Sequence, residues 1–301
     1  MSEPWVAFFN ATLVPIGLML IMFSLGLTLA LRDFGLVARH PKIAGAGFAT
    51  HLFVLPLLGL AVGLLFRLPP ELALGLFIVS ICPAGTTSNA LTFVGRGNVA
   101  LAVVLTALTS LVTVFTIPLL LSWAVPWFLA GGGREVPELS VPGTILQLVR
   151  ITLLPVAAGM VVRRFAPAAA ERMSRWLRPT AFVILVAVIA ISVIVSLEMV
   201  LRSLVRATPA IWTLNVAAMA FGLLLGRLLG ASRRDTMTLA IETGVQNVTL
   251  AIFLTLTVLG SLPLAVTQNI YGVIMILNAS LLIRWWRGRI AAEAQAVEQP
   301  A

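Results

Sequence analysis

The sequence predicts an all-α polytopic membrane protein with nine transmembrane helices. Hydrophobic residues make up 60% of the chain and charged residues 10%, whereas a soluble globular protein is about half apolar and a quarter charged. The mean hydropathy of +1.06 and the single cysteine, Cys82, exclude a soluble enzyme and a disulfide-rich secreted domain. The net charge of +9 is spread over short stretches between apolar runs, which is typical of membrane topology and not of a nucleic-acid-binding face.

Nine apolar runs are each long enough to span a bilayer, which takes about 20 mainly apolar residues. In chain order they cover about 5–31, 42–66, 71–95, 98–127, 141–165, 179–199, 209–230, 236–260 and 263–284. No basic residue precedes the first run, so we expect a retained helix and not a signal peptide. Because no soluble domain fits between the runs, the pattern predicts one transmembrane domain, 1–286, and a short polar tail, 287–301.

Lysine and arginine are concentrated in alternate connections, which predicts the orientation. One set of connections holds fifteen basic residues: Arg32, Arg39, Lys42, Arg96, Arg163, Arg164, Arg172, Arg175, Arg178, Arg227, Arg233, Arg234, Arg284, Arg287 and Arg289. The other set holds four: Arg67, Arg134, Arg202 and Arg206. We therefore expect a cytoplasmic C-terminus and, with nine spans, an N-terminus outside, in an inner cell membrane of bacterial type.

Two of the basic connections have the composition of helices that lie on the membrane surface. In Arg32–His40 apolar residues alternate with charged ones, and Ala166–Arg178 is basic with an aromatic anchor, Trp176. Both patterns suit the lipid interface. Ordinary solvated loops are the alternative.

A first break in the apolar pattern lies inside the run 71–95 and reads Cys82-Pro83-Ala84-Gly85-Thr86-Thr87-Ser88-Asn89. Pro83 lacks an amide hydrogen and clashes with the preceding turn, and Gly85 loosens the next one. Ser88 and Asn89 could cap a second half-helix. We expect an unwound segment, which a membrane protein tolerates only inside protein or around a cavity. A proline kink with its hydroxyls bonded to backbone carbonyls is the alternative.

A second break lies inside the run 236–260 and reads Glu242-Thr243-Gly244-Val245-Gln246-Asn247. Glu242 alone of the eleven acidic residues lies deep in an apolar run. A buried carboxylate is very costly without a partner. No lysine or arginine shares this run, so the candidate partners are a metal cation, a proton or His51. A neutral glutamic acid hydrogen-bonded within the bundle is the alternative.

Breaks in corresponding positions of the two halves of a chain point to a transporter binding site. The amino ends of half-helices suit an anion, whereas carbonyl, hydroxyl and carboxylate oxygens suit a small cation such as sodium. Thr106, one span after the first break, is a further candidate ligand, although such threonines usually bond their own backbone. His51, in the middle of the second run, is either functional or a satisfied structural histidine.

Three ordered motifs resemble the bile acid:sodium symporter family from about residue 15 to 284. They are the weak motif Met22-Phe23-Ser24-Leu25-Gly26-Leu27-Thr28-Leu29, the first break with Arg96-Gly97-Asn98-Val99-Ala100-Leu101 after it, and the second break. The resemblance implies inverted five-helix repeats, in which two broken helices cross in a core domain beside a panel domain. The chain resembles the nine-helix form, with a panel at about 5–31 and 141–199 and a core at about 42–127 and 209–284.

The resemblance also implies the site residues. The first sodium site would use Ser88, Asn89, Thr106 and Glu242. The second would use Glu242, Thr243, Val245 and Gln246, with His51 in place of a family glutamine and with Thr243 and Val245 acting through their carbonyls. The substrate would contact Thr86, Thr87 and Asn247.

Three departures from the family pattern affect these sites. Ala102 stands where the first site has a hydroxyl-bearing residue, and Met275 and Ile276 stand where some members carry a His-Asn pair. His51 changes the second site more, because a neutral imidazole is a poor sodium ligand. We expect the second sodium to be weakened, or replaced by a proton at His51.

These observations predict a secondary active transporter, not an enzyme, that carries a small organic anion with sodium by alternating access. We expect a monomer in the lipid bilayer, with no cofactor beyond the coupling ion and no nucleic-acid partner. The resemblance implies bile acids, steroid conjugates, pantoate-like or 2-oxo acids as substrates. A proton-coupled carrier on the same fold and a non-transporting membrane sensor stay open as alternatives. A hydrolase built on Ser88, His51 and Glu242 is disfavoured, because the chain lacks a nucleophile-elbow motif.

Overall fold

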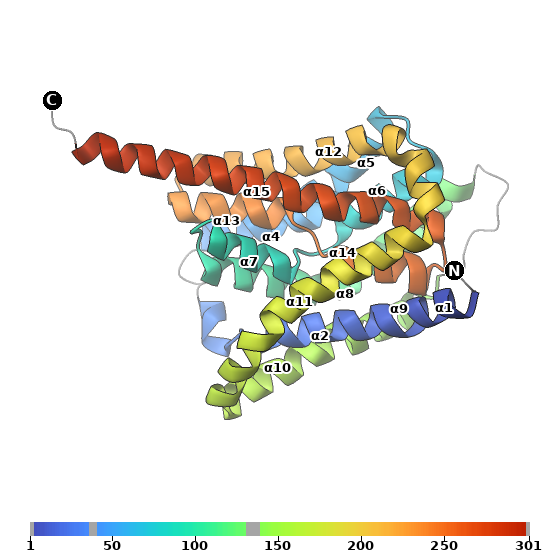
Figure 1. The fold of residues 1–301 in the computed structure, drawn as a ribbon, viewed down its shortest axis with the longest axis horizontal. Coiled ribbons are helices and arrows are strands. Elements are labelled where there is room, and N and C mark those ends of the chain that lie inside the picture. The colour runs from blue at the N-terminus through green and yellow to red at the C-terminus, as the bar shows by residue number, and fades with distance from the viewer. Residues whose placement is uncertain (1–2, 36–40, 131–138, 299–301) are drawn as a thin grey trace.

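The computed structural model describes residues 3–35, 41–130 and 139–298, with side chains up to residue 287 except at position 178. The regular elements within these ranges are all helices, and most of them run along the long axis of the molecule (Figure 1). Seven helices are long and apolar enough to cross a membrane: Pro4–Gly26, Pro41–Leu65, Val99–Leu129, Val141–Phe165, Pro167–Val195, Leu197–Leu228 and Leu262–Arg287. The remaining predicted spans, 71–95 and 236–260, each consist of two shorter helices.

In chain order the elements are α1 (Glu3–Phe8), η1 (Phe9–Leu13), α2 (Val14–Gly26), η2 (Leu31–Phe34), α4 (Pro41–Ala49), η3 (Thr50–Val54), α5 (Leu55–Leu65), α6 (Pro70–Ile81), α7 (Thr86–Val94), α8 (Val99–Leu129), α9 (Val141–Leu148), η5 (Val149–Leu153), α10 (Leu154–Phe165), α11 (Pro167–Val195), α12 (Leu197–Leu228), α13 (Arg233–Gly244), α14 (Val248–Phe253), η6 (Leu254–Val258) and α15 (Leu262–Glu298). The elements η1, η3, η5 and η6 are π-helical turns that continue the neighbouring α-helices, and η2 is a 3-10 turn.

Three of the π-helical turns have the same cause. In η1, η3 and η5 a proline follows two positions after the turn ends, at Pro15, Pro56 and Pro155. A proline ring clashes with the carbonyl four residues before it and donates no hydrogen bond. In each case that carbonyl belongs to the middle of the π-helical turn, whose wider spacing moves the carbonyl away from the ring. The prolines therefore remain inside long helices without ending them.

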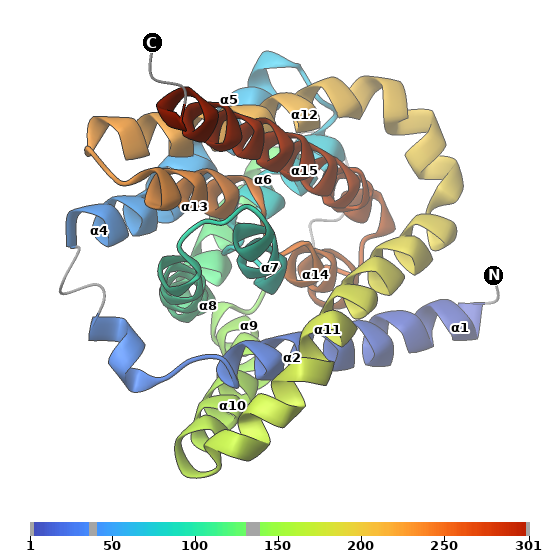
Figure 2. The same cartoon turned by 60° about the vertical axis from the view of Figure 1, so that its left-hand side comes forward.

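The helices form two packed groups. On one side α2, α10 and α11 contact one another, and on the other α5, α6, α8, α12, α13 and α15 form the larger group (Figure 1, Figure 2). Between them, α7 packs on α8 and α2, and α14 packs on α15 and α2. The short helices α7 and α14 thus lie where the two groups meet.

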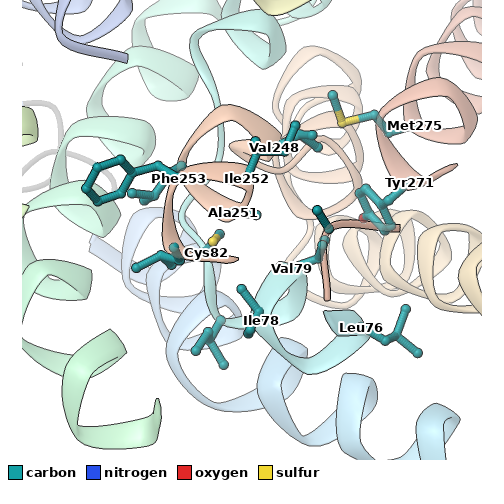
Figure 3. Packing of buried hydrophobic residues seen from close by; sticks show 14 of the residues in the cluster. Leu76, Ile78, Val79, Cys82, Val248, Ala251, Ile252, Phe253, Tyr271 and Met275 are labelled. Atoms are coloured by element: carbon teal, nitrogen blue, oxygen red, sulfur yellow. The ribbon is translucent and has the colours of Figure 1, made fainter. Parts of the chain in front are cut away.

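Part of the main hydrophobic cluster lies among α6, α14 and α15 (Figure 3). Leu76 and Ile78 of α6, Ile252 and Phe253 of α14 and Met275 of α15 are all buried there. Lipid tails are as apolar as these side chains, so close packing and not removal from water favours their contact in a membrane. This packing fixes the position of the two half-helices that border the breaks.

One expectation about the connections is wrong. The stretch predicted as a separate surface helix, Ala166–Arg178, begins α11 and continues without interruption into its apolar part. It is rich in alanine and other good helix formers and contains no glycine, so the helix has no reason to end there. The other predicted surface helix, Arg32–His40, is described only to residue 35, where a 3-10 turn covers Leu31–Phe34; positions 36–40 lie outside the described residues.

The connection predicted between 199 and 209 is also helical. Only Ser196 separates α11 from α12, and α12 starts at Leu197. Glu198 and Arg202 form an exposed ion pair one turn apart on this helix. Such pairs support a helix outside the apolar run, which is why hydropathy located the span but not the helix end.

Candidate functional site

Both predicted breaks are confirmed. The helix α6 ends at Ile81 and α7 begins at Thr86, and the residues on either side of the gap, Cys82 (φ −73°, ψ 151°) and Gly85 (φ −95°, ψ 161°), are extended. Likewise α13 ends at Gly244 and α14 begins at Val248. The first break is therefore an unwound segment and not a simple proline kink.

The two unwound segments cross and contact each other. The amide of Asn247 donates to the carbonyl of Pro83 at 2.9 Å, and the amide of Gly85 donates to the carbonyl of Val245 at 3.3 Å. A side chain at Gly85 would place its Cβ 3.2 Å from the carbonyl oxygen of Gln246, so any larger residue would force the two segments apart by a few tenths of an ångström. Each segment thereby pairs backbone groups of the other, which allows irregular backbone inside a membrane protein.

Glu242 lies next to this crossing and is 1% exposed. The hydroxyl of Ser88 donates to its Oε1, and the hydroxyl of Thr106 donates to its Oε2 at 2.9 Å. The Thr106 hydroxyl also lies 3.4 Å from Oδ1 of Asn89. All four side chains predicted for the first sodium site therefore meet, from α7, α8 and α13.

The partners of Glu242 are hydroxyl groups of the bundle. It is hydrogen-bonded within the bundle, and no hydrogen bond joins it to His51 in the described ranges. Thr106 does not bond its own backbone, as threonines in membrane helices usually do; it is aimed at Glu242. Ala102, at the departure from the family pattern, is fully buried and adds no side-chain oxygen. The set of carboxylate, hydroxyl and amide oxygens fits a hard cation.

The residues predicted for the second sodium site follow Glu242 within one turn. The Thr243 hydroxyl donates to the carbonyls of Leu239 and Ala218, at 2.8 and 2.9 Å. The Gln246 side-chain nitrogen donates to the carbonyl of Thr243 at 2.7 Å. The buried Gln246 Oε1 has no hydrogen-bond donor among the described residues, so it is an oxygen available to a ligand.

His51 lies apart from these interactions. It occupies the π-helical turn η3 and is 2% exposed. Neither ring nitrogen has a hydrogen-bond partner in the part of the chain that the structure describes. Buried polar groups usually have a hydrogen-bond partner, so both ring nitrogens are available to a proton or a ligand.

A cavity of about 360 Å³ lies between the two helix groups. Its polar wall includes Thr86, Thr87 and Asn89 of α7 and Ser24 and Thr28 near the end of α2. Its other lining residues are apolar: Leu25, Ala90, Phe93, Val94, Val99, Val103, Ala181 and Phe182. Thr86 and Thr87 are the first residues of α7, where backbone amides lack intrahelical acceptors and the helix dipole favours negative charge.

Asn247, the third predicted substrate contact, does not line this cavity. Its Oδ1 accepts from the amide of Leu250 at 3.0 Å and caps α14. It borders a separate narrow space, together with Ser110 and Thr152, that has no room for a water molecule. The cavity beside Thr86 thus has room for a ligand, whereas the space beside Asn247 does not.

A buried network behind the second break was missed. The Gly244 carbonyl accepts from Asn215 Nδ2 at 2.7 Å and from the Tyr271 hydroxyl at 2.9 Å, and Asn278 Nδ2 donates to Asn215 Oδ1 at 2.9 Å. Amides inside apolar runs were the available signal, because such groups are buried only with partners.

A second missed link joins the polar ends of the two broken segments. Asn98, which caps α8, donates from its side chain to Asp235 at 2.7 Å and from its backbone to Thr238 at 2.7 Å. These contacts could not be predicted from the sequence, because they depend on how closely α13 approaches the turn before α8.

Comparison with known proteins agrees with this architecture. A sequence model described as the Sodium Bile acid symporter family matches residues 15–203. The chain is 30% identical over 285 residues to the probable sodium/metabolite cotransporter BASS2, chloroplastic, of Oryza sativa subsp. japonica, covering 94% of this chain and 66% of that protein. It is 29% identical over 293 residues to the uncharacterized sodium-dependent transporter YocS of Bacillus subtilis (strain 168), covering 96% and 87%.

More distant similarity reaches an animal protein. The ileal sodium/bile acid cotransporter of Homo sapiens is 26% identical over 246 residues, covering 79% of this chain and 67% of that protein. The chain spans 66% of the length of the two plant relatives BASS2 of rice and BASS1 of Arabidopsis thaliana. The family match and the seven long apolar helices identify an integral, multi-pass membrane protein.

Proposed function

Because this chain belongs to the sodium bile acid symporter family, we propose that it is a secondary active transporter that carries a small organic anion together with sodium. One observation carries the proposal: Asn89 lines the cavity and also contacts the Thr106 hydroxyl beside Glu242. The oxygen cluster suited to a cation and the helix end suited to an anion are therefore consecutive parts of α7. Ligands at the two places would share a wall, as coupled transport requires.

The finer architecture belongs to this proposal. We take α6 with α7 and α13 with α14 as one span each, which gives nine spans and two broken, crossing helices. The group of α2, α10 and α11 would be the panel, and the larger group the core. The antiparallel contact between Ala84 and Gln246 supports inverted repeats, and movement of the core against the panel would give alternating access.

Sodium would be a transported substrate and not a resident cofactor. At the first site it would bind Ser88, Asn89, Thr106 and Glu242, and at the second Glu242, Thr243, Val245 and Gln246. A cation held by α7, α8 and α13 would fix the first turn of α7. An anion at Thr86 and Thr87 would then bind a turn that is already ordered. Each ligand would therefore increase the affinity for the other, which is a coupling free energy between the two sites.

The cavity indicates the kind of anion. Its volume of about 360 Å³ is at the small end of ligand pockets, which span about 300–1,000 Å³. No lysine or arginine of the described residues lines it, so the negative charge would be bound by the α7 amino end and hydroxyls. The mixed lining suits an anion with an apolar body, such as a bile-acid-like or steroid-conjugate compound, a pantoate-like compound or a 2-oxo acid.

Thermal unfolding of the detergent-purified protein tests the sodium part without knowledge of the anion. Sodium is compared with potassium and choline at matched ionic strength and at two pH values. A ligand bound only to the folded state at a hundred times its Kd stabilises by about 2.7 kcal/mol, so we expect a sodium-specific increase in Tm. Glu242→Gln should abolish the increase, whereas the exposed control Glu198→Gln should keep it.

Other outcomes would overturn the proposal. No sodium-specific shift in the wild type, or an unchanged shift in Glu242→Gln, excludes the cation site. Radioactive sodium uptake into proteoliposomes, with each anion class in turn, tests coupling. Uptake of the anion that follows a pH gradient without sodium would indicate a proton-coupled carrier, and binding without flux would indicate a sensor.

A further inference from the structure

Four arginines meet at one end of the larger helix group, away from the crossing. Arg96 lies in the turn between α7 and α8, Arg234 in the first turn of α13, and Arg284 and Arg287 on α15. They line two adjoining hollows of about 410 and 310 Å³, which share Val94 and Arg287. We call the two hollows together the basic groove, defined by these four arginines with Phe93 and Val94.

No acidic side chain neutralises the basic groove within the described part of the chain. No aspartate or glutamate of that part lines either hollow. Asp235, next to Arg234 in sequence, is already occupied, because its two oxygens accept from Asn98 Nδ2 at 2.7 Å and from the Ser232 hydroxyl at 2.6 Å. The Arg234 guanidinium donates a long hydrogen bond, 3.5 Å, to the carbonyl of Gly97, which is neutral. The groove therefore presents positive charge that no carboxylate lining it offsets.

Arg96 has a backbone conformation that disfavours a side chain. Arg96 has φ 56° at the end of α7, where the amide of Gly97 donates to the carbonyl of Thr92 at 2.8 Å. This is the left-handed position at which helices usually end with glycine. The ends of α12 and of η6 use Gly230 (φ 61°) and Gly260 (φ 60°) in this conformation. An arginine in this conformation stabilises the folded protein less than a glycine would. The end of α5 has the same arrangement at Arg67 (φ 47°).

The rest of the basic groove is apolar and open. Phe93 is 73% exposed and Val94 51% exposed, and both also line the cavity beside Thr86. The groove thus joins guanidinium groups to an apolar surface at the mouth of that cavity. Arginine forms paired hydrogen bonds with phosphate oxygens, and an apolar surface beside them suits an acyl chain.

We propose that the basic groove binds the phosphate of an anionic phospholipid, with the arginines contacting the phosphate and Phe93 and Val94 contacting an acyl chain. The apolar exposure favours a lipid over a free phosphate ion, which would leave Phe93 and Val94 uncovered. A lipid bound here would border the mouth of the cavity. The four arginines do not line the cavity proposed for the anion, although Phe93 and Val94 do.

Native mass spectrometry and thermal unfolding of the detergent-purified protein test the proposal, with phosphatidylglycerol, phosphatidylcholine or inorganic phosphate added. The test variant is Arg96→Gly with Arg287→Gln. Glycine suits the backbone at position 96, so this variant should fold as well as the wild type. The control is Arg172→Gln with Arg175→Gln, which removes the same charge from the exposed start of α11.

For the wild type and the control variant, we expect mass spectra that show bound phosphatidylglycerol, and a higher Tm when this lipid is added. Phosphatidylcholine should give neither result. Each basic residue near an anionic lipid surface contributes about a fivefold factor in affinity. The test variant should therefore bind phosphatidylglycerol about thirtyfold more weakly. Equal losses in both variants would mean non-specific charge attraction and overturn the proposal. An increase in Tm with inorganic phosphate equal to that with phosphatidylglycerol would overturn the assignment to a lipid.

Discussion

Thr106 and Glu242 are hydrogen-bonded to each other, with 2.9 Å between Thr106 Oγ and Glu242 Oε2, although 136 positions separate them in the chain. Three residues further along the same helix, the hydroxyl of Thr109 instead donates to the backbone carbonyl of Leu105 at 2.8 Å. Both threonines are fully buried on α8. The hydroxyl of Thr106 is thus directed at Glu242, whereas the hydroxyl of Thr109 is bonded to the backbone of its own helix.

This contrast gives a matched pair of variants. Thr106→Val keeps the shape of the side chain and removes one oxygen from the first sodium site. We expect sodium affinity to fall about tenfold, which lowers sodium stabilisation by about 1.4 kcal/mol when sodium greatly exceeds Kd. Thr109→Val should leave the sodium-specific Tm shift unchanged. Equal shifts in the two variants, measured by thermal unfolding against sodium concentration, would exclude Thr106 as a ligand.

Among the departures from the family pattern, His51 has the clearest expected consequence. His51→Gln supplies an amide oxygen where the resemblance places a sodium ligand, so sodium dependence of stability and uptake should become steeper. His51→Leu is the control, because it removes the imidazole without adding an oxygen. A glutamine variant in which the sodium and pH dependence of transport match those of the wild type would contradict a role for position 51 in the second site.

The breaks could be predicted because their signals are local. Pro83, Gly85 and the carboxylate of Glu242 stand out inside apolar runs whatever the rest of the chain does. Their meeting could not be predicted from the residues alone, because the contact of Gly85 with Val245 joins positions far apart in sequence. The resemblance implied that the two segments cross, and the structure adds the backbone hydrogen bonds that hold them.

The limits of the helices were predicted less well than the spans. Hydropathy measures where the chain is apolar, whereas a helix continues through charged residues that form helices well, as at the starts of α11 and α12. The network of Asn215, Tyr271 and Asn278 was missed for a related reason. All three lie inside predicted spans, and only packing brings Asn215 and Tyr271 to the Gly244 carbonyl and Asn278 to Asn215.

That network should hold the second break in place. Tyr271→Phe removes one of the two side-chain donors to the Gly244 carbonyl, so we expect a loss of about 1 kcal/mol in unfolding free energy. Asn215→Leu removes the other donor and leaves the half-buried Asn278 amide without its acceptor, so we expect a loss of about 2–3 kcal/mol. Thermal or denaturant unfolding measures both, and a smaller effect for Asn215→Leu than for Tyr271→Phe would contradict this order.

Cysteine labelling can test which of the two spaces beside the crossing is accessible to a water-soluble reagent. The lone Cys82 is 1% exposed, so a Cys82→Ala background should be free of native labelling. In that background, Thr86→Cys lines the cavity and should react with a charged, membrane-impermeant thiol reagent. Ser110→Cys is nearly isosteric, lines the narrow space beside Asn247 and should react far more slowly. Reagent added to one side of proteoliposomes at a time should label Thr86→Cys from one side only. Equal labelling of the two cysteines would show that the space beside Asn247 is as accessible as the cavity beside Thr86, and would contradict a cavity that is open to one side of the crossing only.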